Sequence, residues 1–198
     1  MMSDQTDALG GRLPLADPAA LNPAQREIFD RMASRIVPWA NDARFQSTAE
    51  DGRLIGPFNP ALLNPAIASP FLDLQFAEQV HTSLSERVRE VVILAVGAAW
   101  QADYELYAHL AVARKAGLSD DAARTLVAGG LPGDLTEDEK VALRLTRQLS
   151  TRHRVDESLY RDAEDRFGTK GLIDIAFLIG IYHSVCATLT MFAIPAPE

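Results

Sequence analysis

The sequence predicts an all-α protein of eight or nine helices. Apolar residues recur at helical spacing, and the alternating runs of β-branched residues that indicate half-buried strands are absent. Helix-start signals recur as well. Three of them place a capping asparagine before a proline suited to the first helical position, at Asn22-Pro23, Asn59-Pro60 and Asn64-Pro65.

The first helix is expected from Asn22 to Val37. Its apolar face at four-residue spacing consists of Ile28, Met32 and Ile36. Pro38 lacks a backbone donor and is expected to end this helix. Residues 39–57 are polar and irregular, which predicts a loop or arm. Two short helices are expected next, over about residues 60–67 and 70–82.

A central helix is expected over residues 86–99, with Ser85 as its cap. Its second half, residues 91–99, is almost wholly apolar, as in a helix buried on all sides. The next helix begins near residue 102, and Gly117 is a suitable stop for it.

Three start signals predict the next three helices. Ser119 opens one that ends near Gly129, in a glycine-rich turn. The segment Thr136-Glu137-Asp138-Glu139 has the pattern of a capping box and starts another. Asp156 caps a third, which is expected to stop at Gly168.

The last helix begins at Thr169 or Lys170, and Pro195 closes it. Residues 172–192 are apolar nearly all round, but polar side chains such as Asp174 and His183 interrupt them. The uninterrupted apolar stretch falls short of the ~20 residues that a membrane span needs. We therefore expect a helix buried in the core or at a subunit contact, no membrane association, and a homo-oligomer (a dimer, trimer or hexamer).

Composition narrows the class of protein. The length of 198 residues and the hydrophobic content of 47% predict one helical domain, over residues 21–198. The N-terminal residues are polar and contain glycine, which predicts a disordered or extended arm over residues 1–20. The net charge is −8. Without a basic run, nucleic-acid binding is not expected. The single cysteine, Cys186, and the absence of a signal pattern predict a cytoplasmic protein. No metal or cofactor motif is present, so no metal and no cofactor are expected.

Glu105 and His109 are the most informative residues. They lie four apart on one helical face, within an apolar stripe that also holds Leu106 and Ala113. Buried charge is costly unless it is paired, so the two side chains indicate a pocket with perturbed pKa values. The same spacing would fit a buried Glu–His pair with no catalytic role, or a pair at the edge where the apolar stripe meets water.

The chain resembles the carboxymuconolactone decarboxylase family, which includes the alkylhydroperoxidase-D-like proteins. The resemblance lies in Ser85-Glu86-Arg87-Val88-Arg89-Glu90, an apolar helix, an acidic and aromatic segment that ends in His109, and Ala116-Gly117-Leu118-Ser119. It covers about residues 57–129 and extends to Pro195. It implies an alkylhydroperoxidase-D-like multi-helix bundle, usually assembled into trimers or hexamers with the active site near subunit contacts.

The two branches of this family imply different chemistry. The peroxidase branch uses a Cys-x-x-Cys pair, and its cysteines fall on Ala102 and Glu105, so this chain has neither thiol. The decarboxylase branch resembles this chain in having a glutamate at Glu105 and a histidine at His109. It implies the removal of CO2 from a lactone acid, or a related decarboxylation or isomerisation by acid–base chemistry.

The resemblance assigns roles to particular residues. His109 is the candidate proton donor or enolate partner, Glu105 orients it or acts as a base, and Glu90 supports the site from the preceding helix. Candidate substrate-binding residues are Tyr104, Arg89 and Tyr182. Two alternatives stay open, namely a hydroperoxide-reducing protein and a non-catalytic oligomeric binding protein of the same fold.

Overall fold

The computed structural model describes residues 8–198 and is all-helical over that range. It contains a 3-10 turn, η1 (Pro18–Ala20), and eight α-helices: α2 (Pro23–Ala43), α3 (Phe58–Leu63), α4 (Pro65–His81), α5 (Glu86–Trp100), α6 (Asp103–Lys115), α7 (Asp120–Val127), α8 (Glu137–Arg152) and α9 (Glu157–Met191). The β-pairing in this range is limited to one isolated bridge, between Thr48 and Leu54. The predicted fold class is confirmed.

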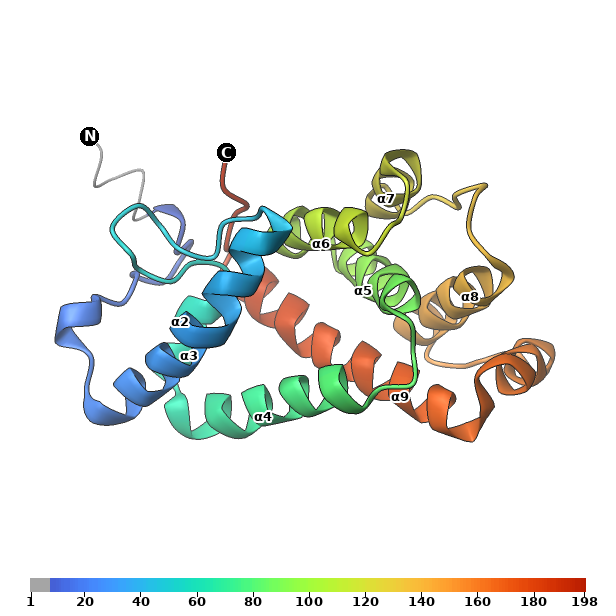
Figure 1. Ribbon diagram of the computed structural model, residues 1–198, viewed down its shortest axis with the longest axis horizontal. Coiled ribbons are helices and arrows are strands. Elements are labelled where there is room, and N and C mark those ends of the chain that lie inside the picture. The colour runs from blue at the N-terminus through green and yellow to red at the C-terminus, as the bar shows by residue number, and fades with distance from the viewer. Residues whose placement is uncertain (1–7) are drawn as a thin grey trace.

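Helix α5 is the centre of the fold and packs against α6, α7, α8 and α9. Every residue from Val91 to Gly97 is buried, as its continuous apolar sequence predicts. Helices α2, α3 and α4 form a second group at the other side of the molecule, and the long α9 runs diagonally between the two groups (Figure 1). Helix α9 contacts α4, α5, α6 and α8.

Helix α2 is longer than the sequence predicted. The expected end at Pro38 is wrong, because the helix continues to Ala43 and ends where Arg44 adopts a left-handed conformation with φ 65°. An internal proline costs ~3 kcal/mol or more. Burial of Ala40 and Ala43, together with the packing of Trp39 against the core, offsets that cost. The extension matters because it carries Trp39 to the central cavity.

The asparagine–proline signals at Asn22 and Asn64 mark helix starts, and the signal at Asn59 does not. Asn22 accepts a hydrogen bond from the Gln25 N–H in a capping box, as predicted. Asn59 is instead buried inside α3, where it binds the backbone of the N-terminal segment. Asn64 precedes α4 but makes no capping hydrogen bond. The helix break therefore falls at Asn64, because a residue before proline is pushed out of the helical region, and Pro70 lies inside α4.

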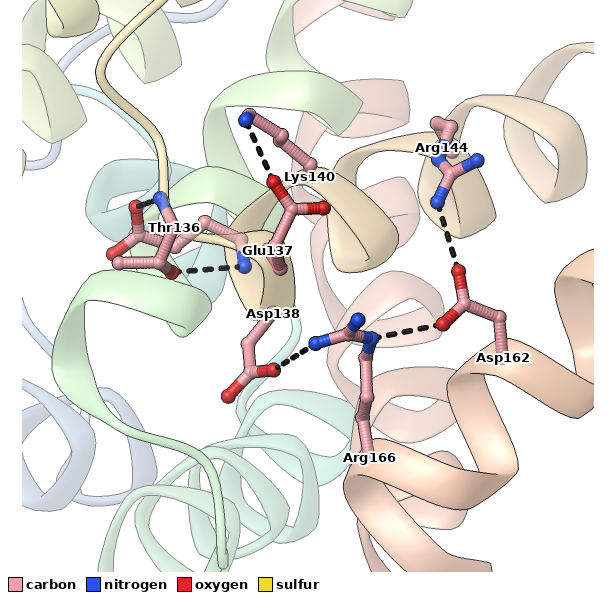
Figure 2. Close-up of polar contacts among 8 residues, drawn as sticks. Thr136, Glu137, Asp138, Lys140, Arg144, Asp162 and Arg166 are labelled. Carbon is pink, nitrogen blue, oxygen red and sulfur yellow. Dashed lines mark hydrogen bonds and ion pairs between the residues drawn. The ribbon is translucent and has the colours of Figure 1, made fainter.

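Ion pairs join α8 to the first part of α9 (Figure 2). Arg166 binds Asp138 of α8 at 2.9 Å and Asp162 of its own helix at 2.8 Å, and Arg144 reaches Asp162 at 3.0 Å. The predicted capping box at Thr136 is present at the start of α8. Gly168 breaks the helical path of α9 with φ 60°, so the expected stop there appears as a kink between two helical stretches.

The N-terminal segment follows the surface from residue 8 onwards, and residues 1–7 of the predicted arm lie outside the described range. The Arg12 N–H donates to the carbonyl of Phe192, and Leu15 is buried. The Ala16 N–H donates to Asn59 Oδ1 at 2.9 Å. These contacts tie this part of the chain to α3 and to the end of α9.

Helix α9 is long and apolar enough to cross a membrane by length and composition, and fewer than half of the residues in its apolar window are buried. A core helix of a soluble protein meets the same test. Ile173 and Phe177 are half exposed, and beside them a shallow apolar groove of about 430 Å³ runs between α9 and α4.

Candidate functional site

A cavity of about 370 Å³ lies between α2, α4, α5, α6 and α9. This volume is at the small end of the range for ligand pockets. More than half of its wall is apolar, and seven of the lining side chains are aromatic. These are Trp39, Phe45, Phe58, Phe71, Phe76, Tyr104 and Tyr182. The three predicted catalytic residues, Glu90, Glu105 and His109, are the buried polar groups on the same wall.

His109 lies between the two carboxylates. Its Nδ1 is 2.8 Å from Glu90 Oε2, and its Nε2 is 3.2 Å from Glu105 Oε1. All three side chains are at most 6% exposed. Glu105 and His109 lie one turn apart on α6, and Glu90 comes from the facing helix α5. The structure thus brings together the three residues that the sequence proposed as catalytic.

The two contacts to His109 differ in kind. The contact to Glu90 has the geometry of a hydrogen bond, whereas the contact to Glu105 meets only the distance of an ion pair. Glu105 Oε1 is accordingly a buried oxygen with no hydrogen-bond partner among residues 8–198. Such a group is costly unless a ligand, water or proton satisfies it. Glu90 therefore fixes the imidazole, and Glu105 keeps an oxygen available.

Close helix packing and aromatic rings position the triad. Gly97 of α5 faces α6, and a Cβ at this position would lie 3.4 Å from Glu105 Cγ and 3.0 Å from Leu106 Cδ2. The Tyr182 ring packs edge-on against His109, with centroids 5.1 Å apart. The Trp39 ring lies 6.1 Å away. These contacts hold the imidazole plane and surround the charged groups with apolar surface.

Burial shifts the pKa of Glu105 upwards, from 4.5 to about 7. The neighbouring His109 opposes this shift, and the charge of Glu90 adds to it. For His109, burial lowers the pKa, but the carboxylates of Glu90 and Glu105 outweigh this effect and leave its pKa raised. Near neutral pH the site therefore holds a charged imidazole beside a carboxyl group that readily gains or loses a proton.

This arrangement suits proton transfer rather than metal binding. The two carboxylates face opposite nitrogens of one ring, so they cannot converge on a single ion with it. No group of three or more histidine, cysteine or acidic side chains that could hold a metal ion is found within residues 8–198.

The predicted substrate-binding residues all line the cavity, but only one has a free polar group. Tyr104 donates its hydroxyl to the carbonyl of Gln46, which ties down the loop after α2. Arg89 is paired with Glu78 at 2.6 Å. The Tyr182 hydroxyl makes no hydrogen bond to the part of the chain that the structure describes, and burial raises its pKa well above the ordinary value, so it stays protonated.

Sequence reasoning missed the contribution of α2 to this site. Arg35 and Trp39 line the cavity, although the sequence placed Trp39 in a loop. The pattern that could have found them is helical, because Met32, Ile36 and Trp39 continue one face at spacings of four and three. The proline at position 38 obscured it.

Cys186 lies in α9 and is fully buried. Burial raises the pKa of its thiol far above the ordinary value. A thiol of this kind is a poor nucleophile, because the reactive form is the thiolate.

Comparison with known proteins confirms the resemblance to a family. Residues 65–148 match the model of the carboxymuconolactone decarboxylase family. This segment runs from the start of α4 into α8 and contains Glu90, Glu105 and His109. No curated protein matches the chain significantly.

Several solved structures share the fold. One is an alkylhydroperoxidase AhpD core, a peroxidase-related protein from Ralstonia eutropha JMP134, with a TM-score of 0.76 and 19% identity over 94% of this chain and 92% of that one. A peroxidase-related protein from Silicibacter sp. TM1040 gives 0.72 and 16% identity, covering 96% and 93%. A variant of the debrominase Bmp8, in complex with 2,3,4-tribromopyrrole, gives 0.63 and 15% identity, covering 90% of each chain. At these identities the likeness establishes an alkylhydroperoxidase-D-like fold.

Proposed function

We propose that this chain, whose residues 65–148 match the carboxymuconolactone decarboxylase family, is a cofactor-independent lyase that decarboxylates a small carboxylated lactone or a related acid. The observation that carries the proposal is Glu105. Its carboxyl group is buried in an apolar cavity, has a pKa of about 7, and has an oxygen without a hydrogen bond beside a histidine held by Glu90.

Each element of the site has a role in this reaction. The aromatic wall removes water from the substrate carboxylate, which raises its tendency to leave as CO2. When the carbon–carbon bond breaks, its electron pair enters the conjugated lactone and becomes an enolate. The charged His109 lies where it can stabilise that negative charge, and the Tyr182 hydroxyl is a second donor in reach of the cavity.

Protonated Glu105 then delivers its proton to the enolate carbon. The products are CO2 and the lactone with hydrogen in place of the carboxyl group, and Glu105 regains a proton from water. A pKa near the working pH is the value that favours both steps. Glu90 is a positioning residue, because it contacts His109 and keeps it charged.

Isomerisation by the same residues is the nearest alternative within this class. There Glu105 would act first as a base, in its ionised form. The pH profile separates the two reactions. A rate that depends on protonated Glu105 falls as the pH rises through about 7, whereas a rate that depends on ionised Glu105 increases.

A hydroperoxide-reducing role has less support. Ala102 and Glu105 occupy the positions of the paired thiols, and the remaining Cys186 is buried with a raised pKa. The non-catalytic binding role predicts that substitutions of Glu105 and His109 leave function intact.

The experiment that tests the proposal measures CO2 release from a carboxylated muconolactone by the wild type, Glu105→Gln and His109→Ala. Loss of a general acid typically lowers the rate about 10²- to 10⁴-fold, and we expect both variants to lose activity on this scale. Glu139→Gln is the matched control, because this buried carboxylate pairs with Arg87 away from the cavity. If the folded wild-type protein releases no CO2, decarboxylation of this lactone is excluded.

A further inference from the structure

We propose that Arg35 of α2 binds a second anionic group of the substrate, at the mouth of the cavity and away from the reacting end. This inference rests on the proposed function and names the part of the substrate that selects it. It concerns a helix that lies outside the segment matching the decarboxylase family.

The cations on the cavity lining differ in whether an acidic side chain already binds them. Besides His109, which Glu90 binds, three basic side chains lie on this lining, namely Arg35, Arg89 and Lys115. Arg89 binds Glu78 with two hydrogen bonds, and Lys115 binds Asp42. Arg35 has no acidic partner among residues 8–198, so its charge is available to a ligand.

An aromatic ring of α4 positions the Arg35 side chain. Its guanidinium lies over the Phe76 ring, 4.0 Å from the centroid. Stacking occupies the face of the planar guanidinium and leaves the N–H groups at its edge free. A carboxylate is the group that such an edge binds best, through two parallel hydrogen bonds. The stack therefore orients Arg35 before a ligand arrives.

Arg35 and the proton-transfer residues lie at different depths of the cavity. Arg35 is exposed to solvent, whereas Glu105 and His109 are at most 5% exposed. Trp39, one helical turn beyond Arg35 on α2, has its ring centroid 6.1 Å from that of His109. A carboxylate that leaves as CO2 beside the buried Glu105 is therefore a different group from one bound at the solvent-facing Arg35. The cavity thus fits a small, flat, apolar body with an anionic group remote from the reacting carbon.

Holding α2 against α4 does not require Arg35. One turn earlier, Arg31 binds both Asp73 and Ser69 of α4. Arg31 is absent from the cavity lining. It therefore provides a control of the same residue type, on the same helix and against the same partner helix.

The test measures binding without turnover. Trans-cinnamate and its uncharged analogue cinnamamide are titrated into Trp100→Phe protein, where the remaining tryptophan, Trp39, lines the cavity and reports by fluorescence quenching. The titration is done above pH 7, where Glu105 is ionised and repels the carboxylate from the inner end. The variants compared are Arg35→Gln, Arg35→Lys and Arg31→Gln.

We expect Arg35→Gln to weaken cinnamate binding about two- to fivefold, the size of an ion pair at an exposed site. Arg35→Gln should leave the affinity for cinnamamide unchanged. The affinity of Arg35→Lys for cinnamate should lie between those of the protein with Arg35 and of Arg35→Gln. Arg31→Gln should change the affinity for both compounds equally or for neither. Glu86 is an exposed acidic residue on the same lining, and Glu86→Gln should not weaken cinnamate binding.

Equal weakening of both compounds by Arg35→Gln would mean that Arg35 only packs, and would overturn the proposal. Unchanged binding of cinnamate by Arg35→Gln would also overturn the proposal. The absence of quenching by both compounds in the protein that keeps Arg35 would do the same. Because no step of catalysis is measured, acid-selective binding at Arg35 together with absent CO2 release would sink the proposed reaction and leave the anion site standing.

Discussion

Replacing Glu105 by glutamine should stabilise the folded protein above neutral pH while it removes activity. The pKa of Glu105 rises from 4.5 to about 7 on folding, chiefly through burial. At about 1.4 kcal/mol per pKa unit, ionisation of this group costs the folded state about 3 kcal/mol. A carboxyl group whose pKa is raised by folding destabilises as the pH increases, so this loss develops between the unfolded value and about pH 7.

Glutamine has the shape of the protonated acid and carries no charge, so Glu105→Gln should escape this loss. His109 also gives up an attractive neighbour, which reduces the gain, and we expect about 1–3 kcal/mol at pH 8. For a chain of this size that is a rise in Tm of roughly 2–12 °C. Urea unfolding at several pH values between about 5 and 8 measures it. The slope between about pH 5 and 5.5 reports Glu105, because His109 in the unfolded chain has an ordinary pKa of 6.5 and is still protonated there.

Glu139→Gln is the opposite case and the control. Glu139 is also buried, and burial alone would raise its pKa, but hydrogen bonds from Arg87 and Thr136 together with the charge of Arg87 outweigh this and leave the pKa lowered. Its ionisation therefore stabilises the fold, and its loss should destabilise the protein at neutral pH. If Glu105→Gln were destabilised like Glu139→Gln at pH 8, or if wild-type stability did not fall between pH 5 and 7, the reasoning about Glu105 would be refuted.

Three further predictions follow from the same contacts. Glu90→Gln removes the carboxylate that holds Nδ1 of His109, so the pKa of His109 should fall and the rate should drop about 10- to 100-fold; an imidazole titration by NMR that does not move would contradict this. Cys186→Ser should leave turnover within about twofold, because the thiol is buried and protonated, and a loss of all activity would revive a cysteine mechanism. We propose that the apolar groove between α4 and α9 is the contact between copies of this chain, so Phe177→Asp should shift the mass measured by light scattering towards the monomer without unfolding it; a monomeric wild type at micromolar concentration would exclude such a contact.

The sequence predicted the parts of this fold that depend on local chemistry. Capping residues such as Ser85 and the box at Thr136 begin their helices as expected, because a side chain satisfies backbone donors within three residues of itself. The predictions failed where distant contacts decide. Pro38 stays helical because residues after it in the helix are buried in the core. The Asn59 side chain accepts a hydrogen bond from the backbone of the N-terminal segment instead of capping a helix. Neither outcome is visible in a window of ten residues.

The site shows the same division between local and distant information. The spacing of Glu105 and His109 on an apolar face was enough to propose a pair, but their roles depend on groups that come from elsewhere. Glu90 approaches from α5 and binds Nδ1 of His109. Glu105 Oε1 has no hydrogen-bond partner within residues 8–198, and burial, with the charge of Glu90 adding to it, raises the pKa of Glu105 to about 7. Arg35 approaches from α2 and is the unpaired cation on the lining within residues 8–198. If both proposals hold, the matched segment supplies the proton chemistry and the N-terminal helix selects the substrate, so exchanging residues 23–43 with those of a relative should change KM for charged substrates more than kcat.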